Sequence, residues 1–215
     1  MEASFWIEKW NQGQIGFHQN KYQDKLVKYF PLFQPKTGQK VLVPLCGKSK
    51  DMIWLHEQKL QVHGIELHEG AVKAFFEENG FNDVAQKNEL GFVHYDFQDI
   101  RVSCGDFFKL NAFEAYDFIY DRASLVALPL EMRKDYAKVV TNALKSGGDY
   151  LLLVYEYDQS KMQGPPFSIS DDEVHELFGK TFDIKKVDSQ KPEEAGPRLD
   201  DLGGFVQNVF LMKKH

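Results

Sequence analysis

The chain has few cysteines and no long apolar run, and both absences exclude whole classes of protein. Cys46 and Cys104 are the only cysteines among 215 residues, which gives no disulfide framework and favours a reducing compartment. Apolar runs such as 150–155 are too short to cross a bilayer, and the N-terminus lacks the pattern of a secretory signal. We therefore expect a cytoplasmic protein that has no membrane partner.

Positive charge is also scarce. Lys and Arg number 26 against 32 Asp and Glu, so the net charge is −6, which disfavours binding to a nucleic-acid backbone. Hydrophobic residues make up 43% of the chain, with 18 phenylalanines, which is ample for one core. We expect a monomer with a single α/β domain over residues 1–215, in which an arm and helix (1–35) precede the main fold (36–215).

The stretch at residues 41–49, Val-Leu-Val-Pro-Leu-Cys-Gly-Lys-Ser, predicts a short buried strand that turns into a helix at 51–58. Gly47 permits a turn or a close ligand approach that a side chain would obstruct. A second apolar strand at 62–67 carries an acid, Glu66, close to its end. Strand, glycine turn, helix and acid-bearing strand form the nucleotide-binding half of a doubly wound fold, where the acid accepts the ribose hydroxyls.

The rest of the chain continues the alternation of strands and helices. Further strands are predicted at 100–104, 116–121, 150–155, 182–187 and 205–212, with an extra strand or hairpin arm at 91–97. Helices are predicted at 22–30, 69–79, 131–144 (ended by Gly147 and Gly148) and 171–178. This order gives a mostly parallel sheet with helices on both faces and a terminal antiparallel pair of strands. Ligands of such sheets bind beyond the carboxyl ends of the strands.

The N-terminal arm is rich in aromatic side chains. Trp6 and Trp10 lie four residues apart, so on a helix they share one face, and Phe17 follows. One interpretation is that these rings only pack the arm on the domain. The other is a lid whose aromatic faces meet a flat or cationic ligand, mobile until the ligand binds.

Three classes of nucleotide ligand compete for the predicted site. A P-loop hydrolase matches Gly47-Lys48-Ser49, but its first glycine would fall on Leu42 inside the strand. A dinucleotide dehydrogenase needs a glycine-rich cradle for the pyrophosphate, and only one glycine is present. S-adenosylmethionine has no phosphate and carries a sulfonium cation, so it fits better, bound either by an enzyme or by a non-catalytic module. His56, His63 and His68 are too irregularly spaced for a metal site, so we expect none.

Four motifs occur in order along nearly the whole chain. They are Trp-x-x-x-Trp with Gly-Phe-His (6–18), Val-Leu-Val-Pro-Leu-Cys-Gly-Lys-Ser (41–49), Tyr-Asp-Arg-Ala-Ser-Leu-Val-Ala-Leu-Pro (120–129) and Gly-Pro-Pro-Phe (164–167). Together they resemble the thiopurine S-methyltransferase family, in its compact bacterial form. The resemblance implies a Rossmann-like fold with a seven-stranded sheet. It also implies methyl transfer from S-adenosylmethionine to aromatic or heterocyclic thiols, and bacterial relatives are associated with selenium and tellurium compounds.

The resemblance also implies how the cofactor is held. Trp6 and Trp10 would close over it, Leu45 would line its methionine end beside the Gly47 turn, and Glu66 would bind its ribose.

Further residues follow from the same resemblance. Gly105 and Asp106 would lie at the adenine, and Arg122 near both cofactor and substrate, as the catalytic residue. Phe17 would contact the substrate. Arg198 falls near a substrate-side arginine of animal members.

Three residues of these motifs have a second interpretation. Asp121 and Arg122 could form only a structural ion pair at a strand end, and Cys46 could be only a small buried hydrophobe. The implied reaction is attack of a thiolate on the methyl carbon. Because acidic aromatic thiols ionise near neutral pH, it requires positioning more than a strong base.

Overall fold

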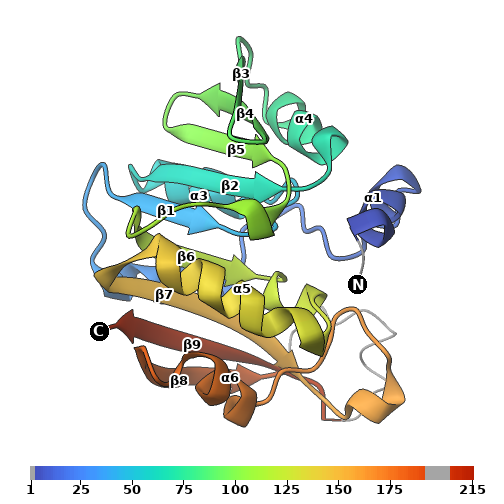
Figure 1. Ribbon diagram of the computed structural model, residues 1–215, viewed down its shortest axis with the longest axis vertical. Helices are drawn as coiled ribbons and strands as arrows, with labels where there is room; N and C mark the ends of the chain where they lie inside the picture. The colour runs from blue at the N-terminus through green and yellow to red at the C-terminus, as the bar shows by residue number, and fades with distance from the viewer. Residues whose placement is uncertain (1–2, 192–203) are drawn as a thin grey trace.

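The computed structural model describes residues 3–191 and 204–215, and these form one layered α/β unit (Figure 1). The strands are β1 (Lys40–Val43), β2 (Gln61–Glu66), β3 (Ala85–Glu89), β4 (Phe92–Phe97), β5 (Ile100–Cys104), β6 (Tyr116–Arg122), β7 (Leu144–Glu156), β8 (Phe182–Gln190) and β9 (Val206–Lys214). The α-helices are α1 (Ala3–Asn11), α2 (Asp24–Tyr29), α3 (Asp51–Glu57), α4 (Glu69–Glu78), α5 (Leu130–Ala143) and α6 (Asp171–Phe178). Short 3-10 helices are η1 (Phe30–Phe33), η2 (Phe107–Lys109), η3 (Leu125–Ala127) and η4 (Gln159–Lys161).

The strands form one sheet in the order β3-β4-β5-β2-β1-β6-β7-β9-β8. The five strands from β5 to β7 pair in parallel, and β9 inserts antiparallel between β7 and β8. The predicted seven-stranded, mostly parallel sheet with an antiparallel C-terminal strand is therefore confirmed as the centre of the fold. The described sheet has nine strands because the β3–β4 hairpin pairs antiparallel on the edge of β5.

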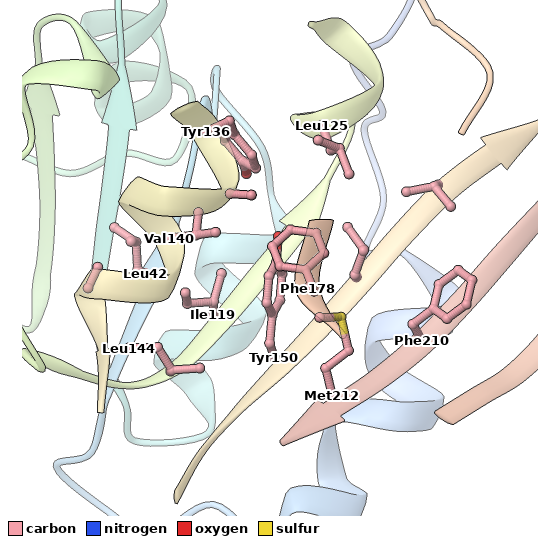
Figure 2. Close-up of a cluster of buried hydrophobic side chains, with 14 of the residues drawn as sticks. Leu42, Ile119, Leu125, Tyr136, Val140, Leu144, Tyr150, Phe178, Phe210 and Met212 are labelled. Atoms are coloured by element: carbon pink, nitrogen blue, oxygen red, sulfur yellow. The ribbon is translucent and has the colours of Figure 1, made fainter. Parts of the chain in front are cut away.

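Two hydrophobic layers cover the two faces of the sheet. On one face α5 and α6 pack on side chains of β1, β6, β7 and β9, and Figure 2 shows Ile119, Tyr136, Tyr150 and Phe178 meeting there. On the other face α2, η1, α3 and α4 cover the same central strands. Burial on both faces explains why β1 and the middle of β7 read as continuous apolar runs.

The junction between α5 and β7 differs from its prediction. The helix ends at Ala143, and Gly147 and Gly148 lie inside β7 instead of closing the helix. The Lys214 ammonium donates to the carbonyls of Thr141 (2.9 Å) and Leu144 (2.7 Å). Carbonyls at a helix end need such partners, so a lysine from β9 takes the place of a glycine cap.

A polar network lies within the sheet beside β2. The His63 imidazole bonds to the Tyr116 hydroxyl through Nδ1 (2.5 Å) and to Ser103 Oγ through Nε2 (2.7 Å). His94 Nδ1 bonds to the same Ser103 hydroxyl at 2.6 Å. Burial, reinforced by the positive charge of Arg101, lowers the pKa of His63 to about 3.

This histidine gives a prediction for stability against pH. An unfolded histidine has a pKa of about 6.5, so between that pH and the lowered folded pKa the unfolded chain binds one more proton. Stability should therefore fall with decreasing pH below about 6.5, at up to about 1.4 kcal/mol per pH unit. Urea unfolding of His63→Gln should give a lower stability at pH 7 but a flatter pH dependence. Parallel curves for the two proteins would contradict a neutral, buried His63.

The carboxyl ends of the parallel strands point toward one side of the molecule. In Figure 1 the arrowheads of β1, β2 and β6 point to the side where α1 lies. The loops that carry the predicted site residues all leave the sheet at this edge, so the fold assembles them beneath the N-terminal arm.

Candidate functional site

The turn after β1 has the shape that its glycine predicts. Leu45 and Gly47 both take left-handed backbone conformations, with φ of 44° and 54°. The Cys46 N–H donates to the Ile65 carbonyl at 2.9 Å, which ties the turn to β2. Leu45 has a side chain in a region that favours glycine, so this turn stores strain of the kind that gathers at ligand sites.

Glu66 holds the same turn from the end of β2. Its carboxylate is 6% exposed and accepts the N–H of Gly47 and the N–H of His68, each at 2.8 Å. Burial raises the pKa of Glu66, while these backbone donors counteract the rise. Each carboxylate oxygen has two acceptor sites, and backbone N–H groups of Gly47, His68 and Leu67 use only part of them, so acceptor capacity remains for a ligand hydroxyl. The geometry fits a hydroxyl of a ribose.

Gly105 and Asp106 follow β5 at the same edge. The Gly105 N–H donates to the Glu66 carbonyl at 2.9 Å, which places the two loops side by side. A Cβ on Gly105 would lie 2.5 Å from the Phe92 ring, so only glycine fits there. Asp106 Oδ1 accepts the Phe108 N–H at 3.0 Å and caps η2. One oxygen of Asp106 is thus committed to the fold.

The arm helix α1 rests on these loops through Trp10. A Cβ built on Gly47 would lie 3.1 Å from Trp10 Cζ2, so the glycine permits close approach of the indole. The indole also stacks on the His68 ring, with centroids 5.8 Å apart and planes 11° apart. Asn11 Oδ1 bonds to His68 Nε2 at 3.0 Å. His68 is therefore the anchor of the arm, although no motif included it. Its place two residues after Glu66 was the one feature of the sequence that could have indicated a position at the site.

Phe17 completes an aromatic cluster with the arm helix. Its ring packs edge-to-face on Trp6 (5.8 Å) and on Trp10 (5.5 Å), and the side chain is 37% exposed. Its carbonyl accepts from Arg122 Nη2 at 3.4 Å. The structure thus brings Trp6, Trp10 and Phe17 together beside the end of β6.

Arg122 and Asp121 do not form the ion pair that one interpretation proposed. Successive strand residues face opposite sides of a sheet. Asp121 is fully buried and accepts the hydroxyls of Tyr136 (2.6 Å) and Tyr150 (2.8 Å). Arg122 Nε is buried and has no hydrogen-bond partner in the described part of the chain. A buried donor of this kind is costly unless a ligand satisfies it.

A link between two loops was not visible in the sequence. Ser124 Oγ donates to the Pro44 carbonyl at 2.7 Å, and the Ser124 N–H donates to Asp121 at 3.2 Å. The turn after β1 and the loop after β6 are therefore fixed to each other, and this fixes the position of Leu45 relative to Arg122.

The remaining predicted residues lie apart from this chemistry or outside the described chain. Cys46 is 8% exposed, and burial raises the pKa of its thiol well above the usual value, so it is a buried hydrophobe as one interpretation held. Arg198 lies outside the described residues. Over residues 3–191 and 204–215, no three His, Cys, Asp or Glu side chains are grouped to hold a metal ion.

The Lys48 side chain weakens the P-loop interpretation. Its ammonium pairs with Glu78 at the end of α4, where a phosphate-binding lysine would instead extend toward the nucleotide. No described helix has the length and apolar composition needed to span a bilayer.

Comparisons with known proteins give both the fold and the family. Among solved structures, a Burkholderia thailandensis 1,6-didemethyltoxoflavin-N1-methyltransferase with bound S-adenosylhomocysteine matches with a TM-score of 0.68 at 17% identity, covering 99% of this chain and 86% of that one. A SAM-dependent methyltransferase from Methanosarcina mazei matches with a TM-score of 0.66 at 15% identity, covering 90% of this chain and 98% of that one. At these identities the likeness shows the methyltransferase fold.

Sequence relatives are much closer. A thiopurine S-methyltransferase of Nitrosospira multiformis is 41% identical over 99% of this chain and 98% of its own. The thiopurine S-methyltransferase of Bordetella petrii is 42% identical and covers 97% of this chain and 98% of its own length. The family model for Thiopurine S-methyltransferase (TPMT) matches residues 1–210. These matches confirm a methyltransferase that uses S-adenosylmethionine as methyl donor, and the chain belongs to the thiopurine S-methyltransferase family.

Proposed function

We propose that this enzyme transfers the methyl group of S-adenosylmethionine to the sulfur of aromatic or heterocyclic thiols such as thiopurines. The observation that carries the proposal is the cluster of Trp6, Trp10 and Phe17 beside Arg122, whose Nε is buried without a hydrogen-bond partner among the described residues. Flat aromatic faces suit a heteroaromatic ring, and a fixed cation suits a sulfur anion. Selenium and tellurium compounds are a second group of acceptors, which the resemblance to bacterial relatives favours.

The residues at the edge of the sheet fit S-adenosylmethionine. Glu66 keeps acceptor capacity for a ribose hydroxyl. The strained turn at Leu45 would line the amino-acid end, and Gly105-Asp106 the adenine. The Nε–H of Arg122 is a donor that an anionic group of cofactor or substrate would satisfy.

The proposed reaction needs little proton transfer when the thiol is already ionised. The bound cofactor supplies an electrophilic methyl group on a positively charged sulfur. Trp6, Trp10 and Phe17 would shield the reacting sulfur from water, and their faces favour a cation. Arg122 would hold the thiolate, and because it stays protonated it acts as a fixed charge and not as a base. Opposite charges cancel as the reaction proceeds, so a dry aromatic site does not oppose it.

We propose that the partner of this chain is a small molecule and that the enzyme acts as a monomer. The net charge of −6 disfavours nucleic acid as an acceptor.

A panel of acceptors tests the proposed function. The protein is incubated with methyl-labelled S-adenosylmethionine and a heteroaromatic thiol, its hydroxyl and amino analogues, or selenite. We expect transfer to the thiol at a kcat/KM at least about 100-fold above that of either analogue, because the neutral analogues give no anion for Arg122. Equal transfer to the hydroxyl or amine, or none to any thiol, would contradict the proposal.

A further inference from the structure

His18 lies next to the residue that contacts Arg122. The Phe17 carbonyl accepts from Arg122 Nη2, and the His18 N–H donates to the Ile15 carbonyl at 2.8 Å. A closed turn therefore holds this segment beside Arg122, and the partly buried imidazole lies close enough to Lys48 and Arg122 for their charges to act on it. Nothing in the roles considered so far uses this ring.

The hydrogen bond between His18 and Asn20 favours the tautomer that carries the hydrogen on Nε2. His18 Nε2 lies 3.1 Å from Asn20 Oδ1. An amide oxygen only accepts, so Nε2 carries the hydrogen in this contact. In the neutral ring Nδ1 is then the basic nitrogen, because the bond to Asn20 keeps the hydrogen on Nε2.

The charges near His18 favour a neutral ring next to an anion. Burial lowers the pKa of His18, and the nearby cations Lys48 and Arg122 lower it further, while the Asn20 bond and the Glu78 carboxylate act in the opposite direction. The imidazole is therefore unprotonated at neutral pH and able to accept a proton. The same two cations would stabilise a thiolate formed beside it.

We propose that His18 is a catalytic base that ionises weakly acidic thiol acceptors. The proposal rests on the proposed thiol methylation. The thiol S–H proton moves to Nδ1, the sulfur forms its bond to the methyl carbon, and the methyl–sulfonium bond breaks toward the departing sulfur. The proton then leaves the imidazolium for water. Acidic heteroaryl thiols arrive already ionised and bypass this step.

The variant His18→Gln tests this with acceptors of different acidity. General bases contribute about 100- to 10,000-fold. At pH 7, kcat/KM should fall at least about 100-fold for an aryl thiol that is mostly protonated, and less than about threefold for a heteroaryl thiol that is fully ionised. For the protonated thiol, the variant's kcat/KM should rise about tenfold per pH unit, because only the free thiolate reacts. His175→Asn, an exposed change on α6, is the matched control.

A measurement of the ionisation state of a bound thiol, made without turnover, distinguishes a basic role of His18 from a role in positioning the substrate. The ultraviolet band of a bound aryl thiolate is measured at pH 7 in a complex with S-adenosylhomocysteine. Wild type should show the thiolate and His18→Gln the neutral thiol, with Asn20→Ala between them. An equal loss of kcat/KM for both thiols, or an unchanged thiolate band, would overturn the role of His18. Wild-type protein that methylates no thiol would instead refute the proposed function.

Discussion

Replacing Arg122 with alanine is expected to reduce turnover about 100-fold or more while the protein stays folded. Loss of one preorganised donor to a developing or resident anion costs about this much in other enzymes. The loss should be larger for weakly acidic thiols, which depend on the cation to ionise, than for strongly acidic ones. Steady-state kinetics with both kinds of thiol, on protein of verified melting temperature, measures it.

Arg122→Lys is the matched variant for this prediction. It keeps the charge but replaces a planar fork with a flexible point charge, so turnover should still fall while the fold and most cofactor affinity remain. A purely structural arginine would give a lower melting temperature and near-normal turnover per folded molecule. The structure weighs against that alternative. Arg122 forms no salt bridge among the described residues, and the neighbouring Asp121 accepts hydrogen bonds from two tyrosines instead. Intact turnover in Arg122→Ala would refute the proposed role.

Replacing Glu66 with alanine is expected to weaken binding of S-adenosylhomocysteine by about 5- to 150-fold, which corresponds to about 1–3 kcal/mol. The change removes the proposed acceptor for the ribose. It also leaves the N–H groups of Gly47 and His68 without their partner, so the turn that faces the ligand loosens. Isothermal titration calorimetry gives the two dissociation constants directly.

Two controls show where the Glu66 effect originates. Glu66→Gln keeps the shape and one acceptor oxygen, so its loss of affinity should be smaller. Glu77→Ala removes an exposed carboxylate from α4 and should leave the affinity unchanged. An unaltered dissociation constant in Glu66→Ala would remove this residue from the site.

The sequence was most informative where chemistry and periodicity coincided. A glycine turn after a buried strand and an acid at the end of the next strand predicted that Gly47 and Glu66 would lie at the same edge of the sheet, and the Gly47 nitrogen lies 2.8 Å from a Glu66 carboxylate oxygen. Parallel strand order then predicted that Gly105 and Arg122 would lie at the same edge. The motifs of the family resemblance supplied the methyl donor, which spacing alone left open among three ligand classes.

Other features carried no pattern that a single sequence reveals. Strand β3 is exposed along its whole length, so it has no alternation of apolar and polar residues, and only its pairing with β4 defines it. The Ser124–Pro44 bond joins loops 80 residues apart, which no local rule predicts. The contact between the Phe17 carbonyl and Arg122, next to His18 in the chain, likewise depends on how the arm folds back.

Hydrogen exchange with and without S-adenosylhomocysteine tests most directly the claim that the cofactor binds where β1, β2 and β5 end beneath the arm. We expect ligand to protect three loops (45–48, 66–68 and 105–108) together with the arm (5–20), because Gly47 contacts both Glu66 and Trp10 there. The strands β8 and β9 at the far edge of the sheet serve as the internal control. Unchanged exchange in the three loops, or protection confined to β8 and β9, would contradict the account.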